Sequence, residues 1–297
     1  MASVLTVTEP ATTRTTATVA LRDATLRFGA RELWRGLDLD VAPGEFVAVL
    51  GPNGSGKTSL LKVLLGLQRL TSGSVTVAGR TPRRGSDLVG YVPQQKAFDR
   101  DIPLRGRDLV RLGLDGHRWG APLPSRAARA RVDRAIESVG ATAFADAPLG
   151  TLSGGEQQRL RIAQALLGDP RVLLCDEPLL SLDLAHQQAT SSLIDARRRE
   201  ANTSVLFVTH EINPVLPLVD RVLYLVGGRW AIGTPDDVMT SERLSALYGT
   251  DVDVVRVRGR IVVVGAPDAA HGDVGAGHHH HPVDDEHDEH SAGRPWV

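Results

Sequence analysis

The most informative stretch of this chain is Gly51-Pro52-Asn53-Gly54-Ser55-Gly56-Lys57-Thr58. It follows the short, almost continuous apolar run Glu45–Leu50, which is typical of a buried strand. Beyond it, leucines recur at helical spacing between Leu60 and Leu67. The stretch matches the pattern GxxxxGK(S/T) at every fixed position, and it lies between a strand and a helix, as that pattern requires. We therefore predict a loop that wraps around phosphate groups.

The residue types in this loop suit phosphate binding. Glycines allow successive backbone N–H groups to turn inward, and the start of the following helix adds partial positive charge. Lys57 can reach the β- and γ-phosphates of a nucleotide, and the Thr58 hydroxyl can be a ligand of Mg²⁺. The alternative is a chance glycine-rich turn, which the complete match and both flanking elements disfavour.

A second motif is the apolar run Val172–Cys175, which ends in two adjacent carboxylates, Asp176 and Glu177. Neighbouring residues on a strand point to opposite sides, so the two can divide the work. We expect Asp176 to hold Mg²⁺ and Glu177 to polarise the attacking water as a general base. The alternative is a solvated acidic strand end, and Cys175 is most simply a small buried hydrophobe. With the phosphate loop, this motif predicts a nucleotide hydrolase.

Apolar strands alternate with helical patterns along the chain, which predicts an α/β fold with a parallel sheet covered on both faces. Residues 18–41 alternate as strands with a turn near Phe28-Gly29-Ala30. Between about 97 and 168 we identify helical pattern only, including a stripe over Val132–Val139 closed by Gly140. Residues 251–265 alternate like a short hairpin. We expect residues 1–17 and 266–297 to be disordered.

Composition narrows the class of protein. The chain has 297 residues, 42% of them hydrophobic and 23% charged, which excludes wholesale disorder and collagen-like structure. No apolar run approaches the roughly 18 residues of a membrane span, and the Thr-rich start does not resemble a secretory signal. One cysteine excludes a disulfide framework. The single cysteine and the absence of a signal or span lead us to expect a cytoplasmic chain. The near-neutral net charge leads us to expect no nucleic-acid partner.

A third motif is Leu152-Ser153-Gly154-Gly155-Glu156-Gln157-Gln158-Arg159. It reads as a capping box, with Ser153 as the N-cap and Glu156 three residues later. It also resembles the signature of ABC-type ATPases. A capped helix start with two exposed glycines can present N–H groups to a phosphate. The resemblance implies that Ser153, Gly154 and Gly155 bind ATP held by a second subunit, in a head-to-tail dimer with two ATPs at the interface.

Other elements of that family follow in the expected order. Gln94 resembles the loop glutamine that touches Mg²⁺ or water and couples to a membrane partner. Asp183 resembles the residue that contacts the opposite subunit's phosphate loop, and His210 resembles the switch histidine at the γ-phosphate. Phe28 lies where the family places an aromatic residue that stacks on adenine, although a core aromatic is the alternative. An isolated histidine is more often structural, but His210 follows a core strand.

The resemblance covers about residues 19–250 and implies an ABC-type P-loop NTPase core at 18–250. This core has an antiparallel β-subdomain and an inserted helical subdomain at about 97–168, followed by a hairpin at 251–265. It implies a transporter ATPase on the cytoplasmic face of the cell membrane, docked on a separate integral-membrane permease. An importer of this kind also works with an extracytoplasmic substrate-binding protein. A non-transport ABC ATPase, an exporter and a metal-storage protein are the alternatives.

Two stretches bear on the transported substrate. The residues Tyr91–Gln94, followed by Asp99–Pro103, resemble the ATPases of zinc, manganese and iron uptake systems, as does the region Leu244–Thr250. We therefore expect uptake of zinc or manganese. Importers of iron chelates and cobalamin are related in the same loop and remain the alternative.

The tail 266–297 is rich in histidine and in acidic residues, which are ligands that Zn²⁺, Ni²⁺ and Cu²⁺ accept. Because a flexible segment can gather several ligands around one ion, we expect this tail to bind Zn²⁺. An acidic solubilising tail is the alternative. The candidate ligands are His278, His279, His280, His281, His287 and His290, with His271 earlier in the tail.

Overall fold

The structure is a computed structural model that describes residues 17–94, 98–99, 101–115 and 125–265. The predicted disordered lead at 1–17, apart from Ala17, lies outside the described residues. So does the whole of the tail 266–297, including its histidines.

The described residues form a central six-stranded sheet that carries the motifs. The order across the sheet is β5 (Val89–Val92), β6 (Val172–Asp176), β7 (Ser204–Val208), β3 (Phe46–Leu50), β8 (Arg221–Val226) and β9 (Arg229–Gly233). Neighbours from β5 to β8 are parallel, and β9 is antiparallel to β8. Every residue of β3, β6 and β7 is buried, as expected for parallel strands covered on both faces. The predicted α/β class is confirmed.

Three strands of this sheet, β5, β8 and β9, are not among those that the apolar runs predict. β5 has four residues and merges with the Tyr91–Gln94 motif, while β9 is a half-exposed edge strand. β8, however, is the continuous apolar stretch RVLYLV, a signal that could have identified it.

Two hydrophobic cores lie on opposite faces of the sheet, because side chains alternate along each strand. In β3, Val47 and Val49 face one core, whereas Phe46, Ala48 and Leu50 face the other. The first core is covered by helix α1 and a three-stranded antiparallel sheet in the described part of the chain, in the order β2–β1–β4. These elements are α1 (Lys57–Leu64), β1 (Val19–Phe28), β2 (Arg31–Val41) and β4 (Ser72–Val77).

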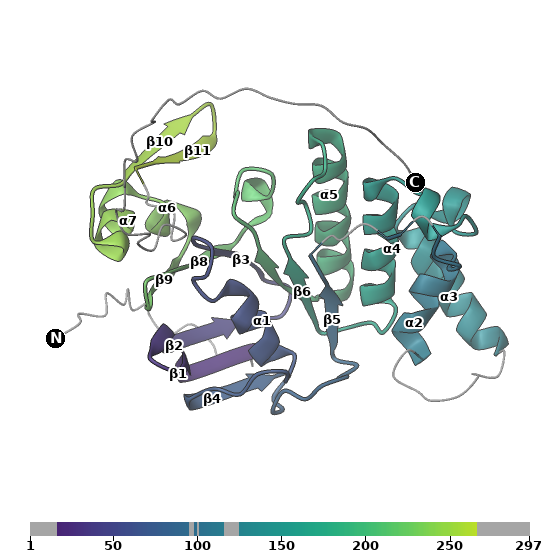
Figure 1. Ribbon diagram of the computed structural model, residues 1–297, viewed down its shortest axis with the longest axis horizontal. Coiled ribbons are helices and arrows are strands. Elements are labelled where there is room, and N and C mark those ends of the chain that lie inside the picture. The colour runs from purple at the N-terminus through teal and green to yellow at the C-terminus, as the bar shows by residue number, and fades with distance from the viewer. Residues whose placement is uncertain (1–16, 95–97, 100, 116–124, 266–297) are drawn as a thin grey trace, which may run out of the picture.

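Helices cover the second face and extend away from the sheet (Figure 1). They are α2 (Gly106–Asp115), α3 (Arg126–Ser138), α4 (Gly154–Leu166) and α5 (Leu184–Ala201), with short 3₁₀ turns at Thr142–Phe144 and Leu149–Thr151. As predicted, α3 is followed by Gly140 in the left-handed conformation, with φ of 63°. The helical pattern at 97–168 therefore corresponds to α2, α3 and α4 in the residues that are described.

The C-terminal part of the described chain folds against β8 and β9. After the 3₁₀ turn Leu216–Leu218 and strands β8 and β9, it comprises α6 (Pro235–Val238), α7 (Ser241–Tyr248), β10 (Asp253–Val257) and β11 (Arg260–Val264). Strands β10 and β11 form the predicted hairpin, which is a separate antiparallel sheet. The Val254 N–H donates to Ser241 Oγ at 2.8 Å, so the hairpin is attached to the start of α7.

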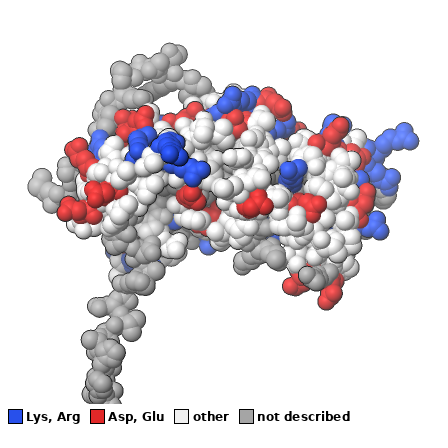
Figure 2. All heavy atoms as spheres, turned by 90° about the horizontal axis from the view of Figure 1, so that it is seen from above, with Lys and Arg blue, Asp and Glu red and all other residues white. Residues whose placement is uncertain are grey.

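Acidic and basic side chains are interspersed among uncharged ones on the face seen from above (Figure 2). This is the side at which the phosphate loop and the starts of α4 and α5 lie.

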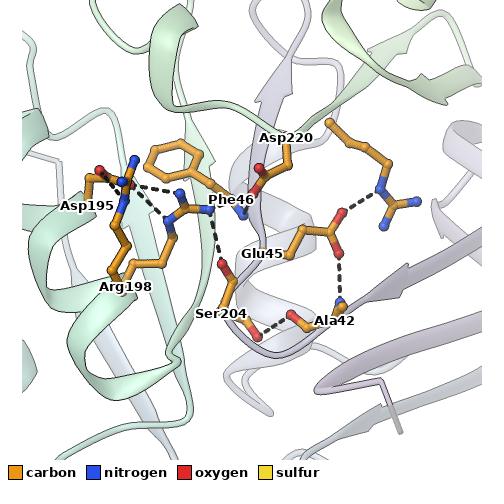
Figure 3. Close-up of polar contacts among 10 residues, drawn as sticks. Ala42, Glu45, Phe46, Asp195, Arg198, Ser204 and Asp220 are labelled. Atoms are coloured by element: carbon orange, nitrogen blue, oxygen red, sulfur yellow. Dashed lines mark hydrogen bonds and ion pairs between the residues drawn. The ribbon is translucent and has the colours of Figure 1, made fainter. Parts of the chain in front are cut away.

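A polar network lies at the amino-terminal ends of the central strands, on the opposite side of the sheet from the motifs (Figure 3). The Arg198 guanidinium of α5 is 2.9 Å from Asp195 and 2.5 Å from Asp220. Asp220 also accepts the Phe46 N–H at 2.7 Å, and the Ser204 hydroxyl donates to Ala42 O at 2.7 Å. The Arg198–Asp220–Phe46 contacts join the amino-terminal ends of β3 and β8 to α5, and the Ser204 bond joins the start of β7 to the residue after β2.

Candidate active site

The phosphate loop connects β3 to α1, and glycine is required at its bends. Gly51 has φ of 138°, and a Cβ there would lie 2.0 Å from the carbonyl oxygen of Leu225. Gly56 has φ of 101°, and a Cβ would lie 2.8 Å from the indole nitrogen of Trp34. Gly56 is also the N-cap of α1, and no described side chain caps this helix. The first N–H groups of α1 are therefore available to a phosphate.

Lys57 is held within this loop. Its ammonium donates to the carbonyl oxygens of Gly51 at 2.7 Å and Pro52 at 2.9 Å. Burial lowers the pKa of Lys57, and the nearby carboxylates of Glu177 and Asp176 oppose that shift. The Ser55 hydroxyl oxygen is buried without a hydrogen-bond partner among the described residues. A cation and an unsatisfied hydroxyl therefore lie together in one loop.

Asp176, the last residue of β6, faces the loop from the neighbouring side. The Thr58 hydroxyl donates to Asp176 Oδ1 at 3.3 Å, and the Tyr91 hydroxyl donates to Oδ2 at 3.4 Å. Burial is the main cause that raises the pKa of Asp176, while the hydrogen bond from Thr58 acts against it. Burial, together with Asp176, raises the pKa of Tyr91 to about 12. Tyr91 was not predicted as a site residue, although it lies three positions before Gln94.

Thr58 and Asp176 fit a magnesium ion, because Mg²⁺ prefers hydroxyl and carboxylate oxygens and commonly takes one or two from the protein. Gln94 does not face Asp176 in this structure; its amide is directed to Glu177 instead. Within residues 17–94, 98–99, 101–115 and 125–265, no group of three or more His, Cys, Asp and Glu side chains could hold a metal ion.

Glu177, Gln94 and His210 meet beyond the ends of three strands. The Gln94 amide donates to Glu177 Oε2 at 3.4 Å, and His210 Nδ1 lies 3.8 Å from the same oxygen. The expectation that strand alternation separates Asp176 from Glu177 is wrong. Strand β6 ends at Asp176, and Glu177 has left-handed backbone, with φ of 47°. This turn, rather than the pleat, directs Glu177 toward Gln94 and His210.

A cavity of about 1240 Å³ connects these groups. It is lined by the phosphate loop, Gln94, Glu177 and His210, and by Phe28 at the end of β1. Phe28 is 49% exposed, so it is not a core aromatic, and its ring is available at the wall of the cavity. Such a cavity at the carboxyl edge of a parallel sheet is where α/β proteins bind ligands.

The capping box at the start of α4 is formed as predicted. The Glu156 N–H donates to Ser153 Oγ at 3.3 Å, and Glu156 Oε2 accepts the Ser153 N–H at 2.8 Å. Only one of the two glycines is exposed, however. Gly154 is exposed, whereas Gly155 is buried because the His186 ring packs on it, with Cδ2 2.4 Å from where a Cβ would be.

Asp183 caps α5 and is tied to the same histidine. It accepts the His186 N–H at 2.9 Å, and His186 Nδ1 lies 2.8 Å from Asp183 Oδ2. These contacts lower the pKa of Asp183. The structure therefore places Asp183 beside the start of α4, through a histidine that no sequence motif identified. Neither Asp183 nor the residues Ser153–Gly155 line the cavity.

Comparison with known proteins identifies the family of this chain. The family model described as "ABC transporter" matches residues 34–180. The zinc import ATP-binding protein ZnuC of Roseobacter denitrificans is 36% identical over 226 residues, which are 76% of this chain and 82% of that protein. The hemin import ATP-binding protein HmuV of Rhizobium meliloti is 36% identical over 246 residues, covering 76% of this chain and 89% of that protein.

A solved structure also resembles the fold. It is a dimeric ATP-binding cassette in a post-hydrolysis state, bound to ADP and Pi. The TM-score is 0.59 at 28% identity, and the match covers 72% of this chain and 97% of that one.

Proposed function

The chain belongs to the ABC transporter ATP-binding family and is an ATPase, and from this premise we propose that it energises uptake of zinc or manganese through a separate permease. The observation that supports the catalytic part is the meeting of Lys57, Glu177 and His210 around one cavity, with Asp176 bonded to Thr58 of the cavity wall. Each of these groups has a distinct task in nucleotide hydrolysis.

Binding of ATP uses the loop and the wall of the cavity. The phosphates occupy the loop Gly51–Thr58, where the first N–H groups of α1 donate to them and Lys57 exchanges its carbonyl partners for phosphate oxygens. The Phe28 ring stacks on adenine. Thr58 and Asp176 would hold Mg²⁺, and Gln94 would be a further ligand if its amide turned from Glu177. When bound, Mg²⁺ neutralises charge on the β- and γ-phosphates.

Hydrolysis uses the cluster at Glu177. Its carboxylate accepts a proton from the attacking water, and the Gln94 amide, once it has turned from Oε2, is near enough to help orient that water. His210 is close enough to Glu177 to reach the γ-phosphate beside it, where it stabilises the charge of the transition state. The left-handed turn at Glu177 places its carboxylate where all three groups converge.

A second subunit completes the site in this proposal. Ser153, Gly154 and Asp183 are exposed and lie outside the cavity, which is consistent with contacts to a nucleotide held by a partner. The dimeric cassette with bound ADP and Pi supports such an arrangement. We propose a homodimer.

A transport function requires two further partners, a membrane permease and a protein that delivers the substrate to it. Over the residues that the structure describes, no helix combines the length and apolar character that a membrane crossing requires. We propose that the chain binds peripherally to an integral-membrane permease at the cytoplasmic face. An extracytoplasmic protein delivers the substrate.

Zinc or manganese is the proposed cargo, supported by the zinc import relative at 36% identity. The His-rich tail supports it independently through its ligand chemistry. Calorimetric titration with Zn²⁺ tests the tail. We expect tight uptake by the full chain and its loss in a version that ends at Ala266, and equal weak uptake by both would exclude a metal-binding tail.

The hemin import relative favours a second candidate, an importer of iron chelates or cobalamin, at the same identity. Elemental analysis separates the two, using host cells that carry this chain or its Glu177→Gln variant under metal limitation. A selective fall in zinc or manganese in the variant supports the first candidate. Unchanged zinc and manganese support a chelate or an exported compound.

The catalytic proposal is tested with the same variant in solution. Glu177→Gln removes the proton acceptor but keeps the shape, so we expect ATP to bind and hydrolysis to fall at least about 100-fold. The trapped nucleotide should hold a dimer, which size-exclusion chromatography in saturating Mg-ATP detects. A variant that remains monomeric would count against the shared site.

A further inference from the structure

The segment that carries His210 is short and is fastened at both ends. At its start, Thr209 N donates to Val49 O of β3 at 3.2 Å. The Thr209 hydroxyl accepts the Glu211 N–H at 3.2 Å and donates to Glu211 O at 2.9 Å. These bonds close a tight turn around His210 and tie one end of it to the central sheet. We call residues 209–213 the switch segment.

The other end is fastened to the C-terminal hairpin. The Asn213 amide Nδ2 donates to Ile261 O at 2.9 Å, and its Oδ1 accepts the Ile261 N–H at 2.8 Å. One side chain thus satisfies both backbone groups of a residue 48 positions away in sequence, as a neighbouring strand would. Asn213 is partly buried, and Ile261 is buried at 4% exposure, so water competes weakly for these bonds.

The imidazole of His210 has little other support. Its side chain is 56% exposed, so packing does not determine where it lies. Ile212 is buried in the same core as Ile261 and Val215, which draws the end of the segment toward the hairpin. The position of His210 therefore depends on the backbone of the switch segment, and that backbone is held by Thr209 on one side and Asn213 on the other.

The hairpin is a firm support because it has anchors of its own. The Arg256 guanidinium is 2.7 Å from Asp236 of α6, and the Val254 N–H bonds to Ser241 of α7. The hydroxyl groups of Tyr224 in β8 and Tyr248 in α7 lie 3.0 Å apart, which ties this unit to the central sheet. Residues 261–263 also line the cavity.

We propose that Asn213 is a positioning residue for hydrolysis and that the hairpin β10–β11, acting through it, holds His210 at the γ-phosphate. The proposal rests on the function proposed above, because it concerns the same site. It assigns to the C-terminal hairpin a role in turnover. The polar network of Figure 3 lies at the amino-terminal ends of the strands. At their carboxyl-terminal ends, where the candidate site lies, the Asn213–Ile261 contact supports the switch segment.

Steady-state ATP hydrolysis by the full chain tests this assignment with Asn213→Ala. Loss of both hydrogen bonds should lower kcat about 5- to 10-fold, while KM for ATP, which the phosphate loop determines, changes less than about twofold. The matched control is Ser241→Ala, which removes one of several attachments of the hairpin but leaves both Asn213–Ile261 bonds in place. We expect its kcat to stay within about twofold of the wild type.

A double-mutant cycle decides whether Asn213 acts through His210. In a His210→Ala background, Asn213→Ala should lower kcat no further. An independent, additive loss there, a fall in activity of Ser241→Ala equal to that of Asn213→Ala, or an unchanged kcat in Asn213→Ala would each overturn the proposal.

Hydrogen–deuterium exchange keeps the proposal falsifiable if Asn213→Ala folds poorly. The Ile261 N–H donates to Asn213 Oδ1, so it should exchange faster in Asn213→Leu, which keeps roughly the size of the side chain but offers no acceptor. Unchanged exchange across 209–213 and 261 would show that the contact does not hold the segment. The proposed function is tested separately: the wild type should hydrolyse ATP and the Glu177→Gln variant should not, whatever the result for Asn213. The proposal for Asn213 and the proposed function can therefore fail independently.

Discussion

Helices α1 and α4 both begin with glycine-rich turns at the same side of the molecule, but among the described residues only α4 has a side chain that caps its first N–H groups. Helix α1 starts after Gly56 and receives no hydrogen bond from any described capping side chain. Helix α4 starts after Ser153 and has a complete capping box with Glu156. The start of α1 leaves its N–H groups to a ligand, whereas the start of α4 satisfies the Ser153 and Glu156 N–H groups within the chain.

The difference matches the tasks proposed for them. The bare start of α1 lines the cavity of its own chain, where phosphate can replace a cap. The capped start of α4 lies outside that cavity and must remain ordered until a partner arrives. Its Ser153 hydroxyl, 2.8 Å from Glu156 Oε2, must turn from Glu156 to meet a phosphate. A helix N-terminus can thus leave its N–H groups open to a ligand or bond some of them within its own chain.

The largest effect is expected from Lys57→Ala, which removes the buried cation at the start of α1. Loss of charge-assisted bonds to two phosphates should weaken ATP binding at least about 100-fold, as measured with a fluorescent nucleotide. Lys62→Ala is the matched control, because Lys62 is an exposed lysine in the last turn of the same helix. Equal affinities for both variants would mean that α1 does not receive the phosphates.

Glycine substitutions at the two helix starts should differ next. Gly56→Ala forces left-handed backbone and a contact with Trp34, so the free energy of unfolding should fall by about 2 kcal/mol. Gly155→Ala lies in ordinary helical backbone and has only to displace the His186 ring, so we expect a change within about 1 kcal/mol. Urea denaturation of both variants measures the difference. Equal losses would contradict the contrast between the two turns.

Removing the cap of α4 should have a smaller effect. Ser153→Ala breaks the capping box and should cost about 1 kcal/mol of stability without nucleotide. At dilutions that keep the chain monomeric, Mg-ATP should stabilise this variant and the wild type by equal amounts, because the chain's own nucleotide satisfies α1 rather than α4. Ser138→Ala, which removes an exposed hydroxyl late in α3, is the control. A cap loss that ATP reverses would mean that the chain's own nucleotide reaches α4.

The smallest effect concerns pH at α5, whose cap is the carboxylate of Asp183. Its native pKa is lowered by hydrogen bonds from His186, so its stabilisation is present above the unfolded pKa and is lost as pH falls through the lower native value. Asp183→Asn should therefore differ from the wild type in thermal midpoint near neutral pH and match it in acid. A difference that persists in acid would point to the capping geometry instead of the charge.

Local motifs predicted much of the fold and of the candidate site, because those parts depend on interactions between residues close together in the sequence. The phosphate loop, the strand ending at Asp176 and the capping box at Ser153 each depend on residues within one turn or strand. The burial of Gly155 could not be predicted, because it depends on a histidine in another helix. Strand β8, by contrast, is predictable from the sequence, because RVLYLV is a continuous apolar run.

Residues that are close together in the sequence predict the glycine-rich loop between β3 and α1, the carboxylates that follow β6, the alternation that makes an α/β sheet and the cap of α4. These are short-range patterns of glycine, charge and hydrophobic period. Only the tertiary structure decided that Tyr91 bonds to Asp176 across 85 residues and that Asn213 holds Ile261 across 48. Strand order and hairpin docking bring such pairs together, and they follow from how apolar faces pack in three dimensions, which no local pattern encodes.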